Sequence, residues 1–366
     1  MAKYIHQLKN WPEFNWDNTV LIPSLTKVRH KQGRLKGYME VLGFAIKNET
    51  LLQTLTLDVL KSTEIEGEIL NPDQVRSSIA RRLGMDIAGL VASDRNIDGV
   101  VEMMLDATQN FDKTLTKDRL FGWHSALFPS GRSGMHKIIV GDWRDSNKGP
   151  MQVVSGSMGR ERVHYQAPEG DILEKEMKVF LKWFNAEQVL DPVLKAAIAH
   201  LWFVTIHPFD DGNGRIARAI ADMQLARSDG DQHRFYSMSA QIRKERNKYY
   251  EILEKTQKGT LDITEWLQWF LNCLDGALDT TEETFKRVLK KAQFWDKQTS
   301  AAINERQRLL INKLFDGFEG NLTSSKWAKI AKCSADTALR DIQDLMDKKI
   351  LKKGEEGGRS TNYVLR

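Results

Sequence analysis

A mostly apolar, alanine-rich run, Val193–Ile206, leads directly into the polar sequence His-Pro-Phe-Asp-Asp-Gly-Asn-Gly-Arg-Ile-Ala-Arg at residues 207–218. The apolar run has the length and composition of a buried helix. Pro208 ends that helix, and the helix-forming residues after Gly214 begin another one. The sequence therefore predicts a mainly α fold in which a short polar loop is held between two helices.

The residues of this loop are those of a site for a polyphosphate. Backbone N–H groups around Gly212, Asn213 and Gly214 can surround an anion, because glycine accepts positive φ angles. The N-terminus of the following helix favours the same anion. Arg215 and Arg218 lie three residues apart and share a helix face, from which both can reach neighbouring phosphates.

Two further side chains of the loop can carry chemistry. Asp211 is a hard oxygen ligand for a Mg²⁺ ion that bridges the phosphates. His207 is placed to take a proton from an attacking hydroxyl. A rival interpretation is a dinucleotide-binding turn, because residues 212–217 also fit the pattern G-x-G-x-x-A. That pattern requires a preceding strand, and the helix predicted at Val193–Ile206 excludes it.

Residues 207–218 resemble the Fic family signature, His-x-Phe-x-(Asp/Glu)-Gly-Asn-Gly-Arg-x-x-Arg, at every defined position. The resemblance implies a Fic-type helical bundle with a short β-hairpin called the flap. It also implies a transfer of AMP from ATP, with Mg²⁺, to a Ser, Thr or Tyr hydroxyl of a target protein and of the chain itself. Some family members move other groups or remove AMP, so removal of AMP stays open as an alternative reaction.

A second motif lies upstream, in the sequence Ser62-Thr-Glu-Ile-Glu-Gly67. It resembles the inhibitory motif (Ser/Thr)-x-x-x-Glu-(Gly/Asn) of one class of Fic proteins. The resemblance implies that Ser62, Glu66 and Gly67 form an inhibitory element in which Glu66 pairs with Arg218. A carboxylate in that position would take the partner of the γ-phosphate and block the productive pose. Helices are expected before the motif, at 24–48 and 49–61.

Two more segments complete the expected nucleotide site. Clustered β-branched residues at 137–144 and 151–157 predict two short strands that pair as a hairpin. Gly141-Asp-Trp-Arg144 matches the run that precedes the flap in the family. The family's run near the nucleotide falls on Val154, Ser155, Gly156 and Ser157. A later segment is similar to one that borders the nucleotide base in the family, and its candidate residues are Tyr249, Tyr250 and Gln257.

The last sixty residues predict a separate module. A helix capped near Thr323, a turn at Cys333-Ser334, a second helix and two strands near 348–354 and 359–365 resemble a winged helix-turn-helix. Residues 300–366 hold 13 Lys/Arg and 9 Asp/Glu, an excess of four in a chain of net charge +5. Acidic residues dilute the second helix, however: Asp336, Asp341 and Asp344. DNA and a second copy of the chain, as a homodimer, therefore both remain open as partners. A DNA-binding regulator whose Fic core senses a nucleotide is the alternative to an enzyme.

The chain of 366 residues has room for three parts. We expect an N-terminal helical domain with the inhibitory motif at 1–118, a Fic catalytic core at 119–296 and the winged helix-turn-helix domain at 300–366. The two cysteines have no motif around them, and no apolar run is long enough to span a bilayer or to form a signal peptide. These features predict a cytoplasmic location and no membrane partner.

Overall fold

The computed structural model describes residues 3–40, 44–85, 90–147, 149–156, 160–187, 189–231, 234–297, 302–315, 320–354 and 361–366. Within them the fold is mainly α-helical, as predicted, with short antiparallel strand pairs. The chain divides into two compact units, Met1–Asp279 and Thr280–Arg366. The first unit holds the expected N-terminal domain and residues 119–279 of the expected catalytic core, and residues 280–296 of that core fall in the second unit. None of the helices in the described ranges has the length and apolar character needed to cross a bilayer.

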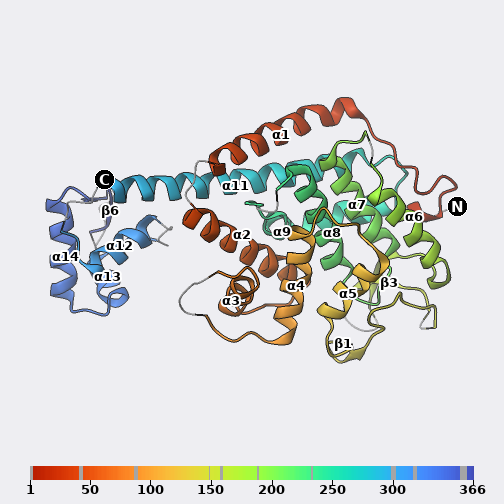
Figure 1. Ribbon diagram of the computed structural model, residues 1–366, viewed down its shortest axis with the longest axis horizontal. Coiled ribbons are helices and arrows are strands. Elements are labelled where there is room, and N and C mark those ends of the chain that lie inside the picture. Colours follow the sequence, from red (N-terminus) through yellow and green to blue (C-terminus); the bar gives the residue numbers. More distant parts are fainter. Residues whose placement is uncertain are drawn as a thin grey trace. The chain divides into compact units, whose positions relative to one another are not determined.

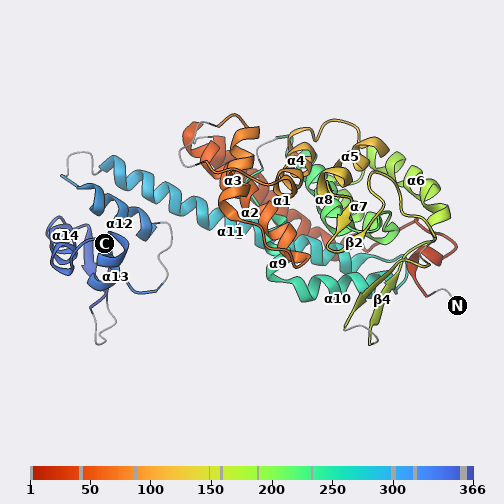
Figure 2. The same cartoon turned by 90° about the horizontal axis from the view of Figure 1, so that it is seen from below.

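The first unit surrounds one buried pair of helices, α7 and α8 (Figures 1 and 2). Its helices, in chain order, are η1 (Ile5–Gln7), α1 (Asn18–Glu40), α2 (Phe44–Ile65), α3 (Pro72–Arg82), α4 (Arg95–Gln109), α5 (Lys117–Leu127), η2 (Gly170–Ile172), α6 (Leu173–Asn185), α7 (Pro192–Ile206), α8 (Asn213–Asp229), α9 (Met238–Lys244), α10 (Arg246–Gln257) and the first part of α11 (Thr264–Lys297).

Helix α7 is the buried helix that the sequence predicts. Pro192 occupies its first turn, and the carboxylate of Asp191 accepts the N–H of Val193, which caps the helix. Every residue from Val193 to Ile206 is buried. Because α7 is apolar all round and packed on all sides, the loop that follows it has a fixed starting point.

The break between the first two long helices lies earlier than predicted. Helix α1 ends at Glu40 and α2 begins at Phe44, whereas the sequence predicted a boundary between residues 48 and 49. The apolar spacing of Leu35, Met39, Leu42 and Ile46 continues across the true break, so periodicity could not locate it. Helix α2 also extends to Ile65 and thus carries the start of the inhibitory motif.

The predicted hairpin has a different partner strand. Strand β3 (Gln152–Ser155) pairs with β4 (Arg162–Gln166), not with residues 137–144. Only His136–Lys137 forms a strand in that region, β2, which pairs with β1 (Arg132–Ser133).

Backbone N–H groups after β2 form hydrogen bonds with the loop that follows α7. The N–H of Ile139 binds the Asp210 carboxylate at 3.0 Å, and the N–H of Arg144 binds the carbonyl of Pro208 at 2.9 Å. The N–H groups of Gly141 and Trp143 also bind side chains, those of His124 and Asp142, so several N–H groups of this segment are not available to a strand ladder. Ser157 lies outside the described residues.

The second unit has a small core of its own. Its helices after α11 are α12 (Glu305–Phe315), α13 (Ser324–Ile330) and α14 (Ala335–Asp347), followed by strands β5 (Leu351–Lys353) and β6 (Tyr363–Leu365). Leu322 bridges to Tyr363 and adds a third backbone segment beside β6. Trp327, Ile342 and Leu345 are among the buried residues that hold these elements together.

Candidate active site

His207 lies at the end of α7 in a left-handed conformation, with φ of 51°. Its N–H closes the last turn on the carbonyl of Phe203. Its Nδ1 lies 3.2 Å from the carbonyl of Val204, an acceptor, so Nδ1 carries the hydrogen and Nε2 keeps its lone pair. Burial lowers the pKa of His207 to about 4. The imidazole is therefore neutral near pH 7 and its Nε2 can accept a proton.

Gly212 and Asn213 fix the conformation of the loop after His207, the first through its backbone angles and the second through its side chain. Gly212 has φ of 81°, and a Cβ there would lie 2.9 Å from the ring of Phe128, so only glycine fits. Asn213 is buried, and its side chain binds both the N–H and the carbonyl of Phe209, at 3.0 and 2.8 Å. The side chain of Asn213 thus holds the loop, and its backbone begins α8, where the helix N-terminus favours an anion.

Asp211 is half-buried beside this helix start. One carboxylate oxygen accepts the N–H of Gly212 at 2.5 Å, and the other accepts the hydroxyl of Ser133 on β1. Within the described residues, no three His, Cys, Asp or Glu side chains gather as a metal site. A single carboxylate suits Mg²⁺ only in its usual substrate-bound form, where phosphate oxygens and water complete the octahedron. Asp211 fits that limited role.

Two arginines of α8 face the same space. Arg218 is buried; its Nη2 lies 2.7 Å from Oε1 of Glu66, and Nη1 has no hydrogen-bond partner. Burial disfavours its charge, but Glu66 together with Tyr249 and Tyr250 more than offsets this, so the pKa of Arg218 is raised. Arg215 is also buried, with its guanidinium 5.1 Å from the ring centre of Phe128 and its Nη1 3.4 Å from Glu68.

The inhibitory motif ends α2 directly over the start of α8. Ser62 accepts two hydrogen bonds from Arg218, at its hydroxyl (2.9 Å) and at its carbonyl (2.8 Å). Gly67 turns the chain with φ of 90° immediately after Glu66. A Cβ on Gly214 would lie 2.3 Å from Oε1 of Glu66, so this carboxylate is seated against the first turn of α8. The Glu66 carboxylate therefore lies between Arg218 and the first turn of α8.

Of the three residues predicted to bind the base, Tyr249 and Gln257 are buried and Tyr250 is half-buried. Tyr249 is buried, and its hydroxyl lies 2.9 Å from Nε2 of His200. Tyr250 is half-buried and its hydroxyl faces the carbonyl of Ile65 at 3.4 Å, next to the inhibitory motif. Gln257 is buried and donates to the hydroxyl of Thr205 at 3.3 Å. All three residues lie on α10, and of the three it is Tyr250 whose side chain reaches the end of α2.

The flap residues Val154, Ser155 and Gly156 lie on β3 and just beyond it, at the free end of the hairpin. Strand β4 runs beside α10 (Figure 2). The base of the hairpin is tied to α7, because the hydroxyl of Tyr165 donates to the carbonyl of Thr205 at 2.7 Å. The hairpin and the motif loop are therefore neighbours through the last turn of α7.

Three residues that shape the loop were not among the predicted site residues. His124 on α5 is buried, stacks on Phe209 at 4.1 Å between ring centroids, and lies 3.2 Å from the carbonyl of Asp211. Arg144 donates to the carbonyl of His207 at 2.7 Å. Ser133 covers the Asp211 carboxylate. Arg144 belongs to the Gly-x-Trp-Arg run, which was the one available signal; His124 and Ser133 carry none.

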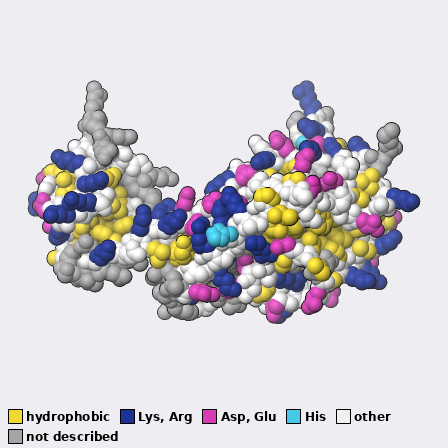
Figure 3. Space-filling view, turned by 90° about the horizontal axis from the view of Figure 1, so that it is seen from above, with side chains coloured by type: hydrophobic (Ala, Val, Ile, Leu, Met, Phe, Trp, Pro, Cys, Tyr) yellow, Lys and Arg dark blue, Asp and Glu magenta, His cyan; other side chains and the backbone are white. Residues whose placement is uncertain are grey.

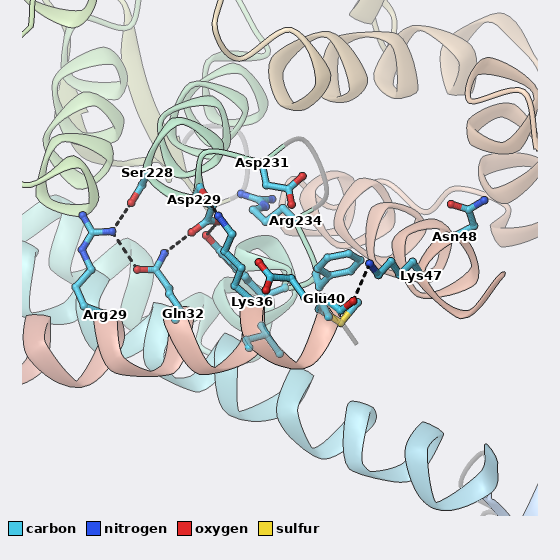
Figure 4. A pocket seen from close by; sticks show the side chains of 15 residues that line it. Arg29, Gln32, Lys36, Glu40, Lys47, Asn48, Ser228, Asp229, Asp231 and Arg234 are labelled. Atoms are coloured by element: carbon cyan, nitrogen blue, oxygen red, sulfur yellow. Dashed lines mark hydrogen bonds between the residues drawn. The ribbon is translucent and has the colours of Figure 1, made fainter. Parts of the chain in front are cut away.

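A cavity of about 530 Å³ lies elsewhere, between α1, the start of α2 and the end of α8. Figure 4 shows Arg29, Gln32 and Lys36 of α1 beside Ser228 and Asp229 of α8, with Arg29 and Gln32 bonded to them at 2.5 and 2.8 Å. None of the residues of the motif loop lines it.

Comparison with known proteins agrees with this geometry. Residues 114–225 match the family model "Fic/DOC family", and residues 4–85 match "Domain of unknown function (DUF4172)". Residues 114–225 therefore form a Fic/DOC domain within the chain.

Curated relatives and solved structures extend this assignment. The chain is 28% identical over 257 residues to "Protein adenylyltransferase Fic" of Culex quinquefasciatus, which covers 68% of this chain and 46% of that protein. It is 30% identical over 178 residues to "Protein adenylyltransferase fic-1" of Caenorhabditis elegans, covering 48% and 32%. The chain thus spans less than half the length of these relatives.

Among solved structures, a Fic family protein from Desulfovibrio desulfuricans has a TM-score of 0.54 at 19% identity and covers 96% of this chain and 97% of that one. A Fic-domain signalling protein from Bacteroides thetaiotaomicron has a TM-score of 0.52 at 19% identity, covering 73% and 97%. These two similarities show the fold.

Proposed function

We propose that this protein is an adenylyltransferase that moves AMP from ATP to a Ser, Thr or Tyr hydroxyl of a target protein, itself included, and that Glu66 inhibits it. The observation that carries the proposal is the pairing of Arg218 with Glu66 at 2.7 Å, over a helix N-terminus and beside a neutral imidazole. A carboxylate seated among phosphate-binding groups marks an anion site that a nucleotide can take over. The activity named for the curated relatives supports the same reaction.

Each step of the reaction has a residue in place for it. Nε2 of His207 takes the proton of the attacking hydroxyl. A bond forms from the hydroxyl oxygen to the α-phosphorus, the bond to the bridging oxygen of the β-phosphate breaks, and pyrophosphate leaves. Backbone N–H groups at the start of α8, together with Arg215 and Arg218, stabilise the phosphate charge. Tyr250 and Gln257 border the base.

Asp211 would hold Mg²⁺ through its carboxylate. When bound, the ion neutralises phosphate charge and orients the leaving group. Asp211 would first have to release the hydroxyl of Ser133.

The test is incubation of the full chain with ATP labelled at the α- or the γ-phosphate. We expect α-label, and no γ-label, to enter protein in Glu66→Gly and far less in the wild type. His207→Ala in the Glu66→Gly background should lower the transfer rate by at least about 10³-fold without changing the melting temperature. Full transfer by that double variant would refute the assignment of the base. Release of AMP from pre-modified protein by the wild type alone would assign the removal reaction instead.

We propose a second function for the C-terminal unit, the binding of duplex DNA by a winged helix-turn-helix. The observation that favours it concerns the acidic residues of α14. Asp341 is buried and binds Arg306 of α12 at 2.8 Å, and Asp344 binds Gln307 of α12 at 2.6 Å. Asp341 is thus buried against α12, and Asp344 is paired although its side chain is 46% exposed, so these two carboxylates weaken a positive surface less than the sequence implied. Asp336 remains exposed on α14.

Exposed cations gather on this unit, which carries many of the Lys and Arg side chains seen in Figure 3. The exposed ones on and around α13, α14 and β5 include Lys329, Lys332, Arg340, Lys352 and Lys353. We expect binding of a fluorescent random-sequence duplex whose affinity falls steeply with salt, and a smaller salt slope in Lys329→Ala/Lys332→Ala. A chain that dimerises but shows no salt-dependent DNA affinity would assign the unit to self-association.

A further inference from the structure

Three side chains outside the motif loop form a hydrogen-bonded chain on the β3–β4 hairpin. Oγ of Ser155 lies 2.5 Å from Nε2 of His164, and Nδ1 of His164 lies 2.6 Å from Oε2 of Glu254. Ser155 and His164 belong to the two strands, and Glu254 belongs to α10. A hydroxyl, an imidazole and a carboxylate in this order are the parts of a serine nucleophile with its base and orienting acid.

A β-bulge places the imidazole between its two partners. Val153 pairs with Tyr165 and Val154 pairs with Val163, so His164 has no residue opposite it in β3. An unpaired residue of this kind bends its strand and re-aims its side chain. His164 is therefore directed across the hairpin to Ser155 on one side and to α10 on the other.

The hydrogen bonds fix where each proton lies. The other carboxylate oxygen of Glu254, Oε1, accepts from Arg162 at 3.0 Å and from Lys258 at 2.6 Å. Although partial burial opposes it, the hydrogen bonds from Lys258, His164 and Arg162 lower the pKa of Glu254 to about 2. The ionised carboxylate can only accept, so Nδ1 of His164 carries a hydrogen. In the neutral imidazole Nε2 then accepts the hydroxyl hydrogen of Ser155.

We propose that Ser155 is a nucleophilic serine, with His164 as its general base and Glu254 as the residue that orients His164. Its substrate is a small activated ester or anhydride of phosphorus or of a carboxylic acid. Oγ forms a bond to the phosphorus or acyl carbon, the bond to the leaving group breaks, and the Ser155 proton passes to Nε2 of His164. Ser155 is exposed, so such a donor can reach it from solvent.

The position on α10 indicates one donor that the chain itself would hold. Tyr250, Glu254 and Gln257 are spaced at i, i+4 and i+7, so they lie along one face of the helix. Tyr250 and Gln257 are the residues assigned to the nucleotide base. The choice of ATP as a donor therefore rests on the proposed function, whereas the reactivity of Ser155 does not.

The experiment is labelling of the full-length chain with an alkyl fluorophosphonate, in which Oγ displaces fluoride. Peptide mass spectrometry then gives a rate for each serine. We expect Ser155 to react about 10²-fold faster than Ser325, an exposed serine with no histidine on its hydroxyl. His164→Gln should remove that advantage, and Glu254→Gln should reduce it about 10-fold.

Arg162→Ala is the matched control, because it removes one bond between the hairpin and Glu254 but leaves the contact with His164. It should change the Ser155 rate less than about 3-fold. A Ser155 rate equal to that of Ser325, or one unchanged by His164→Gln, would overturn the proposal. Equal losses in Arg162→Ala and Glu254→Gln would also do so, since attachment of the hairpin would then explain the rate.

A second arm incubates the Glu66→Gly chain with ATP in place of the probe. AMP found on Ser155 would support the proposal and identify the chain's own nucleotide as a donor. AMP found only on other residues, with probe labelling of Ser155 intact, supports the relay with an external donor. No AMP anywhere would count against the proposed function, while the probe still decides the reactivity of Ser155.

Discussion

Two buried arginines join helix α2 to the Fic core, and they are held in different ways. Arg234 lies between Asp58 of α2, at 2.8 Å, and Asp222 of α8, and all three side chains are at most 2% exposed. Arg218 is equally buried, but its carboxylate partner, Glu66, is 29% exposed and lies beyond the end of the helix. One contact is sealed from water, and the other opens to it.

We call the contact of Arg234 with Asp58 and Asp222, which water cannot reach, the anchor, and the contact of Arg218 with Glu66, which water can reach, the lock. An ion pair that is buried on both sides has no substitute partner, because water cannot replace either charge. Glu66 can return to water when it leaves Arg218, and under the proposed function a triphosphate would take its place. Arg218 also has an unbonded Nη1, which leaves donor capacity for a second anion. Helix α2 can thus stay docked through Asp58 while its C-terminal end changes partners.

Replacing each arginine with methionine tests the difference between the two contacts most directly. Arg234→Met leaves Asp58 and Asp222 buried with no cation and should lower the free energy of unfolding by about 3–5 kcal/mol. Arg218→Met leaves Glu66, which can turn to solvent, and the two acceptors of Ser62 but no buried charge, and it should lower the free energy of unfolding by about 1–2 kcal/mol. Urea denaturation measures both. Equal losses would mean that Arg218 is as much an anchor as Arg234.

The next largest effect concerns the lock alone. Glu66→Gln removes the charge that competes for Arg218 and should strengthen ATP binding about 10–100-fold, the equivalent of about 1.5–3 kcal/mol for a charge-assisted hydrogen bond. Glu68→Gln is the matched control: Glu68 also meets a motif arginine, Arg215, but at 3.4 Å and with 55% exposure. Its change should stay below about 3-fold. Calorimetric titration with ATP measures both, and equal gains would deny Glu66 a specific role.

The parts of the molecule whose structure depends on neighbouring residues in the sequence could be predicted. Helix α7 follows from one apolar run, and the loop from a compact motif in which glycine, arginine and histidine have separate reasons to be present. The contact between Glu66 and Arg218 could be expected only through resemblance, because nothing local relates residues so distant in the sequence.

The parts that depend on distant partners could not be predicted. The hairpin was paired wrongly because the segment at 137–144 has β-branched residues, but the N–H groups of Ile139 and Arg144 bind the loop after α7. The Arg234 cluster left no signal, since Asp58, Asp222 and Arg234 look like ordinary surface charges until α2 and α8 meet. Asp341 likewise looks like part of an acidic helix face in the sequence, because its partner Arg306 is distant along the chain and meets it only in the fold.

Acid and base should also distinguish the two contacts. Arg234 faces two carboxylates, and burial together with the nearby Asp58 raises the pKa of Asp222 from 3.8 to about 7. At Asp222 the folded chain then binds more protons than the unfolded chain between these pH values, so the contribution of Asp222 to the free energy of unfolding falls as pH rises through that window. We expect the wild type to lose about 2 kcal/mol relative to Asp222→Asn between pH 5 and 8, since one such group changes stability by at most about 1.4 kcal/mol per pH unit. A difference between the two proteins that stays constant or grows over this range would contradict the prediction.

The smallest effect tests what orients Arg218. The hydroxyl of Ser62 accepts its Nε at 2.9 Å, so Ser62→Ala leaves a buried donor with no acceptor and should cost about 1 kcal/mol of stability. Thr63→Val is the control next to it: the Thr63 hydroxyl donates to the carbonyl of Val59 within α2, and a carbonyl inside a helix already has an N–H partner, so its loss should cost less. The melting temperature of each variant, measured by thermal unfolding with and without ATP, distinguishes the two. Because Ser62 also holds Arg218 beside Glu66, Ser62→Ala should gain more from added ATP than Thr63→Val does; an equal gain would leave Glu66 as the only side chain that governs Arg218.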